Sequence, residues 1–228
     1  MSLDESKREE IRETYDMRDF SPSALFPDQH VPKFRLVFEE LYRECRTLGH
    51  RLLDYLGIGL GLEEGFLSGK HRNVGTEWNG TALRTLFYPP VSVPEEDYVI
   101  RCASHSDYGS LTLLFQDDVG GLEVQTKAGE WVEARPVPEA ILINVGDLLE
   151  LWTAGLYRAT PHRVILGQRR KEDSERGKRF RQSIAFFFHP DNDVTVEPVV
   201  TAANSSRQWI PLNAWEHLKS RFTSTYDN

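Results

Sequence analysis

The chain has 228 residues, of which 39% are hydrophobic and 11% aromatic, enough for one sizeable hydrophobic core. Its formal net charge of -8 and isoelectric point near 5.4 argue against nucleic acid or an anionic membrane as the main partner. The apolar runs are far shorter than a membrane-spanning helix requires, so we expect no membrane association.

The chain contains two cysteines, Cys45 and Cys102. They fit neither a disulfide framework nor a CxxC metal site. We expect both thiols to be reduced and buried, as in a cytoplasmic protein.

The first part of the chain divides at residue 32. Residues 1–31 are charged and then loop-like, with a helix allowed over about 4–15. Apolar residues then recur at helical spacing, which predicts a helix over 32–56 that packs one face against a sheet. We therefore expect an N-terminal extension, 1–31, followed by a single domain, 32–228.

After about residue 80 the sequence is typical of β-structure, with short apolar runs separated by Gly, Pro and Asp turns. Strands are predicted at 81–90, 98–107, 109–117, 118–126, 129–136, 140–146, 162–167, 181–190 and 193–199. Many short strands at regular spacing indicate an antiparallel barrel or a double-sheet jelly roll. We expect a β core over about 81–200 and a C-terminal helix over about 212–226. The charged run 168–180 is expected to be a solvated loop between two strands.

One predicted strand carries a polar pair beside apolar residues, in "ASHSDYGSLTLLF" at 103–115. His105 and Asp107 are two positions apart, so their side chains share one face of the strand. An imidazole and a carboxylate suit a divalent metal. Two histidines and one carboxylate form the open-sided site of non-haem Fe(II) oxygenases.

A third ligand is available among the seven histidines of the chain. His162, in "ATPHRVIL", begins a β-run just after Pro161, and a residue before proline is extended, so Thr160 leads into that strand. The remaining histidines have no companion at ligand spacing and are expected to be structural or exposed: His30, His50, His71, His189 and His217.

A candidate anion site follows in "RQSIAFFF". Arg181 and Ser183 are again two positions apart on one face of a strand. Arginine binds a carboxylate through two parallel hydrogen bonds, and a serine hydroxyl adds one more. The pair therefore predicts a carboxylate clamp.

These motifs occur together with the phrases "LRTLFYPP", "HSDYGSLTLLFQDDVGGLEV" and "NVGDLLELWTAGLYRATPHRV". The combination resembles the isopenicillin N synthase-like Fe(II)/2-oxoglutarate-dependent dioxygenases. The resemblance spans roughly 25–228 and is most specific across 81–190. It implies a mainly β fold with flanking helices, the double-stranded β-helix or jelly roll.

The resemblance also assigns roles to residues of this chain. It makes His105, Asp107 and His162 the ligands of Fe(II). It makes Arg181 and Ser183 the clamp for the distal carboxylate of the co-substrate 2-oxoglutarate. Tyr88 matches the family tyrosine that faces the co-substrate, with plain core packing as its alternative.

The implied reaction couples decarboxylation of 2-oxoglutarate by O₂, which yields succinate and CO₂, to oxidation of a small-molecule substrate. Hydroxylation is the default outcome, and desaturation and cyclisation occur in the family. An iron oxidase of the same fold that does not use 2-oxoglutarate remains an alternative, because a substrate carboxylate can occupy the clamp. A turnover-deficient metal-binding relative is a second. A zinc hydrolase fits less well, because it leaves the Arg-x-Ser pair without a role.

Further residues are candidates for the substrate pocket. They are Arg84, Arg101, Leu114, Asn144 and Phe188. The two arginines could instead lie at the surface or at a sheet edge. The aromatic residues of the last strand could instead pack in the core.

Two departures from the family pattern carry expectations. The chain begins later than is usual in the family, so we expect it to be N-terminally truncated and to lack part of the pocket wall. The interval between His162 and Arg181 is long, and we expect the inserted run to form a loop tip that leaves both strands intact. The exposed face of the helix over 32–56 has no obvious second apolar stripe, so we expect a monomer.

Overall fold

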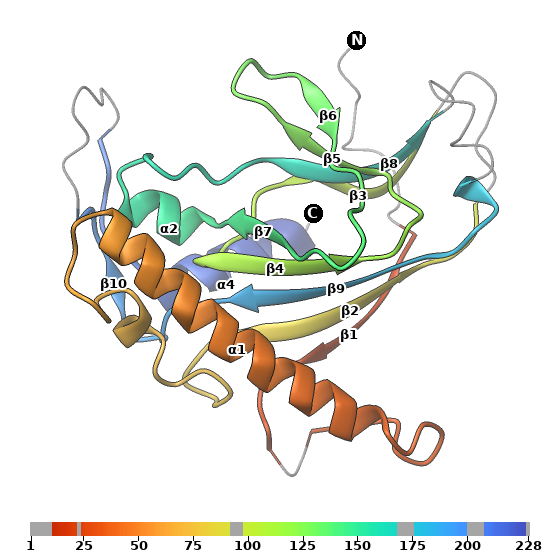
Figure 1. The fold of residues 1–228 in the computed structure, drawn as a ribbon, viewed down its shortest axis with the longest axis horizontal. Helices are drawn as coiled ribbons and strands as arrows, with labels where there is room; N and C mark the ends of the chain where they lie inside the picture. The colour runs from red at the N-terminus through yellow and green to blue at the C-terminus, as the bar shows by residue number, and fades with distance from the viewer. Residues whose placement is uncertain (1–10, 22–23, 92–97, 168–175, 200–207, 227–228) are drawn as a thin grey trace.

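The computed structural model describes residues 11–21, 24–91, 98–167, 176–199 and 208–226. Its longest helix, α1 (Phe34–Gly59), crosses the outside of a β-sheet diagonally (Figure 1). The buried residues of α1 are three or four positions apart and so form one stripe, at Phe38, Tyr42, Cys45, Gly49, Leu53 and Gly57. The helix continues beyond the predicted end at residue 56 and includes Gly57 and Gly59. Gly61, just after the helix, has a φ of +75°, a left-handed conformation that is common where helices end.

Two antiparallel sheets form the β core. The larger contains, in spatial order, β1 (Glu13–Met17), β2 (Ala82–Tyr88), β9 (Arg181–Phe188), β4 (Leu111–Gln116) and β7 (Leu142–Val145). The smaller contains β3 (Tyr98–His105), β8 (His162–Gly167), β5 (Leu122–Gln125) and β6 (Trp131–Glu133). From β2 onwards the chain passes repeatedly from one sheet to the other, as in a jelly roll. The predicted double-stranded β-helix is confirmed.

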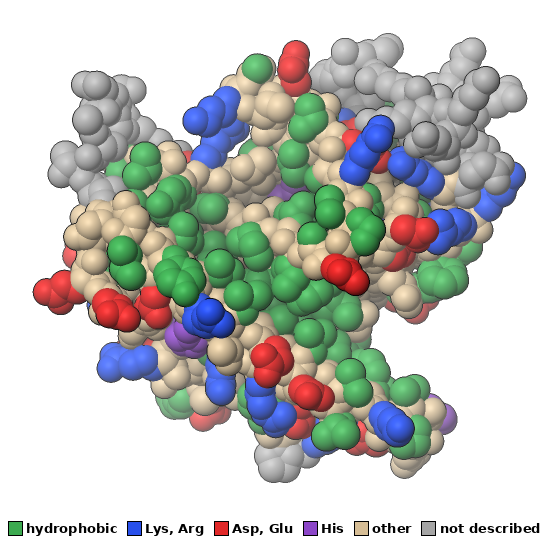
Figure 2. Space-filling model, in the orientation of Figure 1, with side chains coloured by type: hydrophobic (Ala, Val, Ile, Leu, Met, Phe, Trp, Pro, Cys, Tyr) green, Lys and Arg blue, Asp and Glu red, His purple; other side chains and the backbone are tan. Residues whose placement is uncertain are grey.

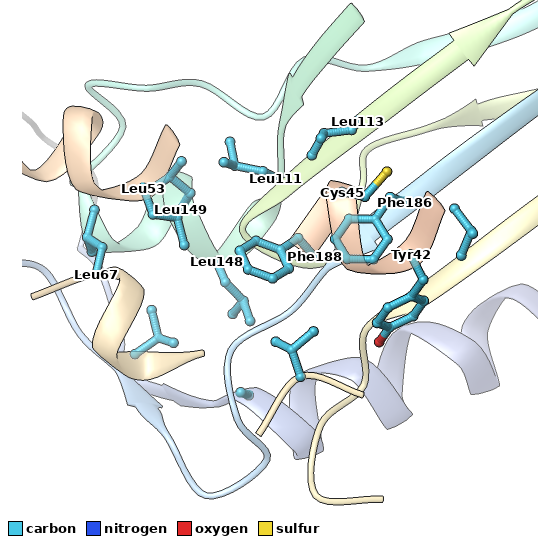
Figure 3. Close-up of a cluster of buried hydrophobic side chains, with 14 of the residues drawn as sticks. Tyr42, Cys45, Leu53, Leu67, Leu111, Leu113, Leu148, Leu149, Phe186 and Phe188 are labelled. Atoms are coloured by element: carbon cyan, nitrogen blue, oxygen red, sulfur yellow. The ribbon is translucent and has the colours of Figure 1, made fainter. Parts of the chain in front are cut away.

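The two faces of the larger sheet have different surroundings. Its outer face packs against α1, where Phe186 and Phe188 of β9 meet Tyr42 and Cys45 (Figure 3). Its inner face is turned toward the smaller sheet, where Leu114 belongs to a second apolar cluster that also includes residues of β3, β5 and β8. Side chains alternate between these faces along each strand, so position along the strand decides which residues can enter the space between the sheets.

Short elements connect and flank the sheets. They are the 3₁₀ helix η2 (Ser68–Lys70), the helix α2 (Asp147–Trp152), the strand pair β10 (Thr195–Val196) and β11 (Leu212–Asn213), and the C-terminal helix α4 (Ala214–Tyr226). The strand predicted over 193–199 is only the two-residue β10, which pairs with β11 outside the two main sheets.

The N-terminal segment differs from expectation. Residues 13–17 form strand β1 rather than the end of a helix, and β1 is hydrogen-bonded to β2 at the edge of the larger sheet. Tyr15 and Met17 join the α1 core, which fastens this strand to the domain. The predicted loop over 168–180 lies partly outside the described residues. Strand β8 ends at Gly167 and β9 begins at Arg181 on either side of it.

The outer surface beside α1 is partly apolar. Figure 2 shows charged side chains of both signs along the helix and a group of apolar side chains next to it, over the larger sheet. On α1 itself, Leu36 and Tyr55 are exposed by 66% and 63%. The described part of the chain contains no helix of the length and apolarity needed to cross a membrane.

Candidate active site

The three predicted metal ligands lie together. His105 ends β3 and His162 begins β8, and the two are directly opposite in the register, with ring centroids 4.3 Å apart. Asp107 lies two residues beyond β3 and is buried. Each residue offers one ligand atom, and the three atoms lie within 4.8 Å of one another. Among the described residues, this is the one group of three or more His, Cys, Asp or Glu side chains close enough to share a metal ion.

Backbone carbonyls fix the orientation of both imidazoles. Nδ1 of His105 lies 2.9 Å from the Ala103 oxygen, and Nδ1 of His162 lies 3.1 Å from the Thr160 oxygen. A carbonyl only accepts, so each Nδ1 carries a hydrogen, and Nε2 is the ring nitrogen that remains to face a metal. This partnership of the second ring nitrogen is the usual way in which a protein orients a metal-binding histidine.

The carboxylate is also held. The Asn144 amide donates to Oδ2 of Asp107 at 3.2 Å, and Oδ1 lies 3.7 Å from Nε2 of His162. Burial lowers the pKa of His162, with the charge of Asp107 acting in the opposite direction. The site therefore offers two imidazole nitrogens and one carboxylate oxygen, a donor set that fits Fe(II).

The candidate carboxylate clamp is buried at the other end of the inner face. The Arg181 guanidinium donates from Nε to the Gly120 carbonyl at 3.0 Å and from Nη1 to the Ser183 hydroxyl at 3.2 Å. Nη2 reaches the Gln116 amide oxygen at 3.4 Å. These neutral partners fix the position of the cation without neutralising it.

Tyr88 lies beside this cation. It faces Arg181 across the β2–β9 ladder, and the guanidinium carbon lies 5.0 Å from the centre of its ring. Burial, followed by the proximity of Cys102, raises the pKa of Tyr88, which keeps the phenol protonated and able to donate.

A single cavity of about 770 Å³ joins the two groups. Nine of the candidate residues line it: Tyr88, Arg84, His105, Asp107, Leu114, Asn144, His162, Arg181 and Ser183. The cavity is large enough for a co-substrate and a small organic substrate together.

Two candidates do not line this cavity. Phe188 lies on the outer face of β9 against α1, because its side chain alternates with that of Phe187, which does line the cavity. Arg101 is fully buried beyond the cavity wall, at a place where the pairing of β3 with β8 shifts register between Ile100 and Cys102. Arg101 thus lies on β3, the edge strand of the smaller sheet, but it is buried and not at the surface.

Strand β1 and helix α4 supply cavity residues that the sequence did not suggest. From β1 and its flanks come Arg12, Asp16 and Arg18, and from α4 come Leu218, Phe222 and Ser224. A signal for β1 was present in "RETYDMR", where Tyr15 and Met17 alternate with polar residues as on a half-buried strand. His189, expected to be structural or exposed, is buried and lines the cavity as well.

An ion pair forms part of the wall on this side. Arg84 donates to both carboxylate oxygens of Asp16, at 2.6 and 2.7 Å, across the β1–β2 ladder. The guanidinium carbon of Arg84 also lies 5.5 Å from the centre of the Phe187 ring. This pair joins the N-terminal strand to the domain and places charge beside an aromatic wall.

Comparison with known proteins gives consistent results. The family model described as "2OG-Fe(II) oxygenase superfamily" matches residues 79–190. The 2-oxoglutarate-dependent dioxygenase htyE of Aspergillus rugulosus is 34% identical over 95% of this chain and 68% of its own length. This chain belongs to the 2OG-Fe(II) oxygenase superfamily. It is accordingly a 2-oxoglutarate-dependent oxygenase that uses Fe(II) and O₂.

Other superfamily members extend the comparison. A full-length Neurospora crassa protein, solved in complex with alpha-KG, aligns with a TM-score of 0.78 at 27% identity, covering 94% of this chain and 66% of that one. Gibberellin 20 oxidase 2 of Oryza sativa is 35% identical over 91% of this chain. The chain spans about two thirds of the first of these proteins and 48% of the second. The superfamily fold thus serves differently named enzymes, and the substrate depends on residues that differ among them.

Proposed function

We propose that this oxygenase binds Fe(II) through His105, Asp107 and His162 and holds the distal carboxylate of 2-oxoglutarate with Arg181 and Ser183. The observation that supports the proposal is that both groups line one cavity. Tyr88 faces Arg181 across the strand ladder and is proposed to help orient the co-substrate.

The remaining volume is proposed to take a small organic substrate. Arg84, Leu114 and Asn144 line it and are proposed to contact substrate or to support the residues that do. Hydroxylation is the proposed outcome, with desaturation or cyclisation as variants of the same oxidation.

The residues of the cavity would have separate roles in the reaction. Bound iron supplies the activation of O₂ that amino acid side chains cannot supply. The two imidazoles, held through Nδ1, would present Nε2 to the metal, and the Asp107 carboxylate would offset part of the metal charge. Arg181 fixes one end of the co-substrate, so that its 2-oxo acid end can reach the metal. Apolar residues around this space, such as Leu114 and Val164, limit the entry of water.

The proposal also covers the extent of the catalytic domain, the cellular compartment and the assembly of the protein. The described residues would act as one catalytic domain, with β1 included because it pairs with β2. Cys45 and Cys102 are buried thiols, which are compatible with the reducing cytoplasm. We also propose that the protein works as a monomer without nucleic acid, which sedimentation and a gel-shift assay would test.

An anaerobic titration tests the central proposal. Fe(II) and 2-oxoglutarate are added to the parent protein while the weak visible charge-transfer band of the chelate is recorded. The band should disappear in His162→Ala and require far more 2-oxoglutarate in Arg181→Ala. His30→Ala and Arg135→Ala change exposed residues and should behave as the parent.

The opposite results are equally informative. Folded parent protein that binds Fe(II) but gives no band with 2-oxoglutarate would contradict the proposed clamp. Succinate formation in air then separates a 2-oxoglutarate-dependent oxygenase from an iron oxidase that uses another reductant.

A further inference from the structure

Two arginines are buried at the clamp end of the fold. Arg181 is 1% exposed and Arg101 is completely buried. Arg101 donates from Nη2 to the Pro89 carbonyl at 3.1 Å, and the Arg179 carbonyl lies 3.5 Å from the same atom. Pro89 follows Tyr88, and Arg179 precedes Arg181 by two residues. The Arg101 guanidinium is therefore fixed where β2 ends and β9 begins, next to the proposed clamp.

Within the described part of the chain, neither cation is hydrogen-bonded to a carboxylate. Nε and Nη1 of Arg101 are buried without a hydrogen-bond partner there. Arg181 uses a carbonyl, a hydroxyl and a side-chain amide. Burial, and then the like charge of Arg181, lower the pKa of Arg101. Tyr88 and Asp117 act in the opposite direction. The unliganded fold thus holds the buried Arg101 cation, with two unpartnered nitrogens, next to the Arg181 cation, which is unfavourable.

An anionic ligand would remove this cost. Arg101 does not line the cavity, whereas Arg181 and Ser183 do. A carboxylate that bound the clamp would therefore touch Arg181, while Arg101 would act on it through its field. Charge interactions weaken slowly with distance in a low-dielectric interior, so contact is not required.

We propose that Arg101 is a positioning residue that selects a co-substrate with a second carboxylate, and that the unliganded protein is less stable because of it. This inference rests on the proposed clamp. It adds to the clamp a second residue, Arg101, which does not touch the co-substrate. Arg101 would nevertheless help the protein to prefer 2-oxo acids with two carboxylates over those with one. Removal of the Arg101 charge should therefore weaken the binding of 2-oxoglutarate and raise the stability of the unliganded protein.

The binding test uses two probes of equal chain length. 2-Oxoglutarate and 2-oxovalerate differ in the group at carbon 5, which is a carboxylate in the first and a methyl group in the second. Dissociation constants are measured by calorimetry on the Mn(II)-loaded protein, without turnover. In Arg101→Met, binding of 2-oxoglutarate should weaken about tenfold, or about 1.4 kcal/mol. Binding of 2-oxovalerate should change less than twofold.

Two further variants separate charge from shape. Arg101→Lys keeps the charge and should keep most of the preference for 2-oxoglutarate, whereas Arg101→Gln should lose it as Arg101→Met does. In an Arg181→Met background, Arg101→Met should have a much smaller effect, because the carboxylate is no longer held nearby. Arg135→Met is the matched control at an exposed arginine.

The stability test needs no ligand. Metal-free Arg101→Met should melt about 2–4 °C above the parent, because a buried charge with two unpartnered nitrogens has been replaced by an apolar chain. A lower melting temperature, or failure of the variant to fold, would contradict the inference and indicate a structural role. Equal weakening of both probes, or loss of preference in Arg101→Lys, would contradict it as well.

The proposed clamp is tested separately by the parent. If the parent does not prefer 2-oxoglutarate to 2-oxovalerate, the clamp itself is wrong. If the parent prefers 2-oxoglutarate and Arg101→Met keeps that preference, the clamp stands and the role given to Arg101 is wrong.

Discussion

His71 is an uncharged histidine enclosed by the fold. Its Nδ1 donates to the Leu67 carbonyl at 2.9 Å, its Nε2 accepts from the Ser110 hydroxyl at 2.8 Å, and its ring stacks on Phe188. Burial lowers its pKa to about 3. The residue connects η2 to the loop that follows Asp107, so its protonation would disturb the approach to the site.

The pH dependence of stability follows from this shift. Between about pH 3 and pH 6.5 the unfolded chain binds a proton at His71 and the folded chain does not. The free energy of unfolding must therefore fall as the pH falls through this window, by up to about 1.4 kcal/mol per pH unit from this residue. Urea unfolding between pH 4.5 and pH 7 measures the slope.

A substitution isolates that contribution. The glutamine in His71→Gln cannot titrate. The free energy of unfolding of this variant should therefore change less steeply with pH than that of the parent, by up to the equivalent of one bound proton. His189 still contributes to the pH dependence that remains. His30→Gln, which replaces an exposed histidine, is the control. Parallel slopes for the parent and His71→Gln would contradict a neutral His71.

Single residues also mark where sequence reasoning succeeds and where it stops. The spacing of His105 and Asp107 predicted their proximity because side-chain alternation on a strand is a local rule. The same rule placed the wrong phenylalanine of β9 in the pocket. Phe188 was the candidate, but Phe187 lines the cavity and Phe188 packs against α1. Arg101 could not be placed, because the register shift that buries it depends on how β3 pairs with β8.

At the scale of elements, α1 approaches the larger sheet closely at Gly49. A Cβ built there would lie 2.9 Å from Cε1 of Phe188, shorter than normal contact. At Gly57, in the same helix, the nearest atom to such a Cβ is 3.8 Å away, in Leu67. The two glycines therefore differ in packing while they share a helical backbone.

This difference predicts opposite effects of alanine. Gly49→Ala should destabilise the fold by about 1–3 kcal/mol, because overpacking outweighs the gain in helix propensity. Gly57→Ala should stabilise it by about 0.5–1 kcal/mol, because only the propensity changes. Denaturant unfolding of both variants provides the measurement, and a stable Gly49→Ala would show that α1 can move away from Phe188.

Helix α4 is linked to the loop that carries the candidate ligand Asp107 through Asp147, the first residue of α2. The Ser106 hydroxyl donates to Oδ1 of Asp147 at 2.7 Å, and Oδ2 lies 3.3 Å from Nε2 of His217 and 3.5 Å from Nε of Arg221. Burial raises the pKa of Asp147, but His217, Ser106 and Arg221 together lower it below its usual range. Ser106 lies between two candidate ligands, so this linkage reaches the candidate metal site.

Asp147→Asn should weaken the linkage while keeping the shape of the side chain. We expect Mn(II) affinity to fall about tenfold, as for other residues that orient metal ligands, and α4 to be cleaved faster by protease. Exposed Asp193→Asn is the control. If the variant binds Mn(II) as tightly as the parent but α4 is cleaved faster, Asp147 anchors α4 and does not support metal binding.

Among the elements, length determined what the sequence could predict. The helical spacing over 32–56 identified α1 because a stripe of many turns is hard to imitate. The short α2 and β1 escaped prediction, since segments of six and five residues with mixed apolar and polar side chains fit several conformations. The edge position of β1 is a property of the sheet, set by its pairing with β2.

At the scale of the molecule, the candidate metal centre lies where the two sheets meet. His105 and His162 belong to the smaller sheet, whereas Asp107 lies in the connection to β4 and is held by Asn144 of β7 in the larger one. The cavity charge also differs from that of the chain as a whole. Arginines outnumber aspartates along its wall, while the net charge of the protein is -8. This local excess suits a co-substrate with two carboxylates.

A metal that joins the sheets should stabilise the whole fold. At a hundredfold excess of metal over its dissociation constant, binding to the folded state alone adds about 2.7 kcal/mol. For a chain of this size, that corresponds to a melting temperature roughly 5–10 °C higher. Mn(II) is a suitable probe because it is stable in air, and amide hydrogen exchange in β3 and β8 should slow together with the rise in melting temperature.

Asp107→Asn distinguishes this effect from general metal binding. Asparagine keeps the shape of the side chain but lacks the carboxylate charge, so most of the Mn(II)-induced rise should disappear, and chelation should return the parent to its metal-free melting temperature. Asp193→Asn should retain the full rise, because that side chain is exposed outside the three-residue cluster. An equal rise in Asp107→Asn would mean that the stabilising ion binds elsewhere and that the two sheets are held together without it.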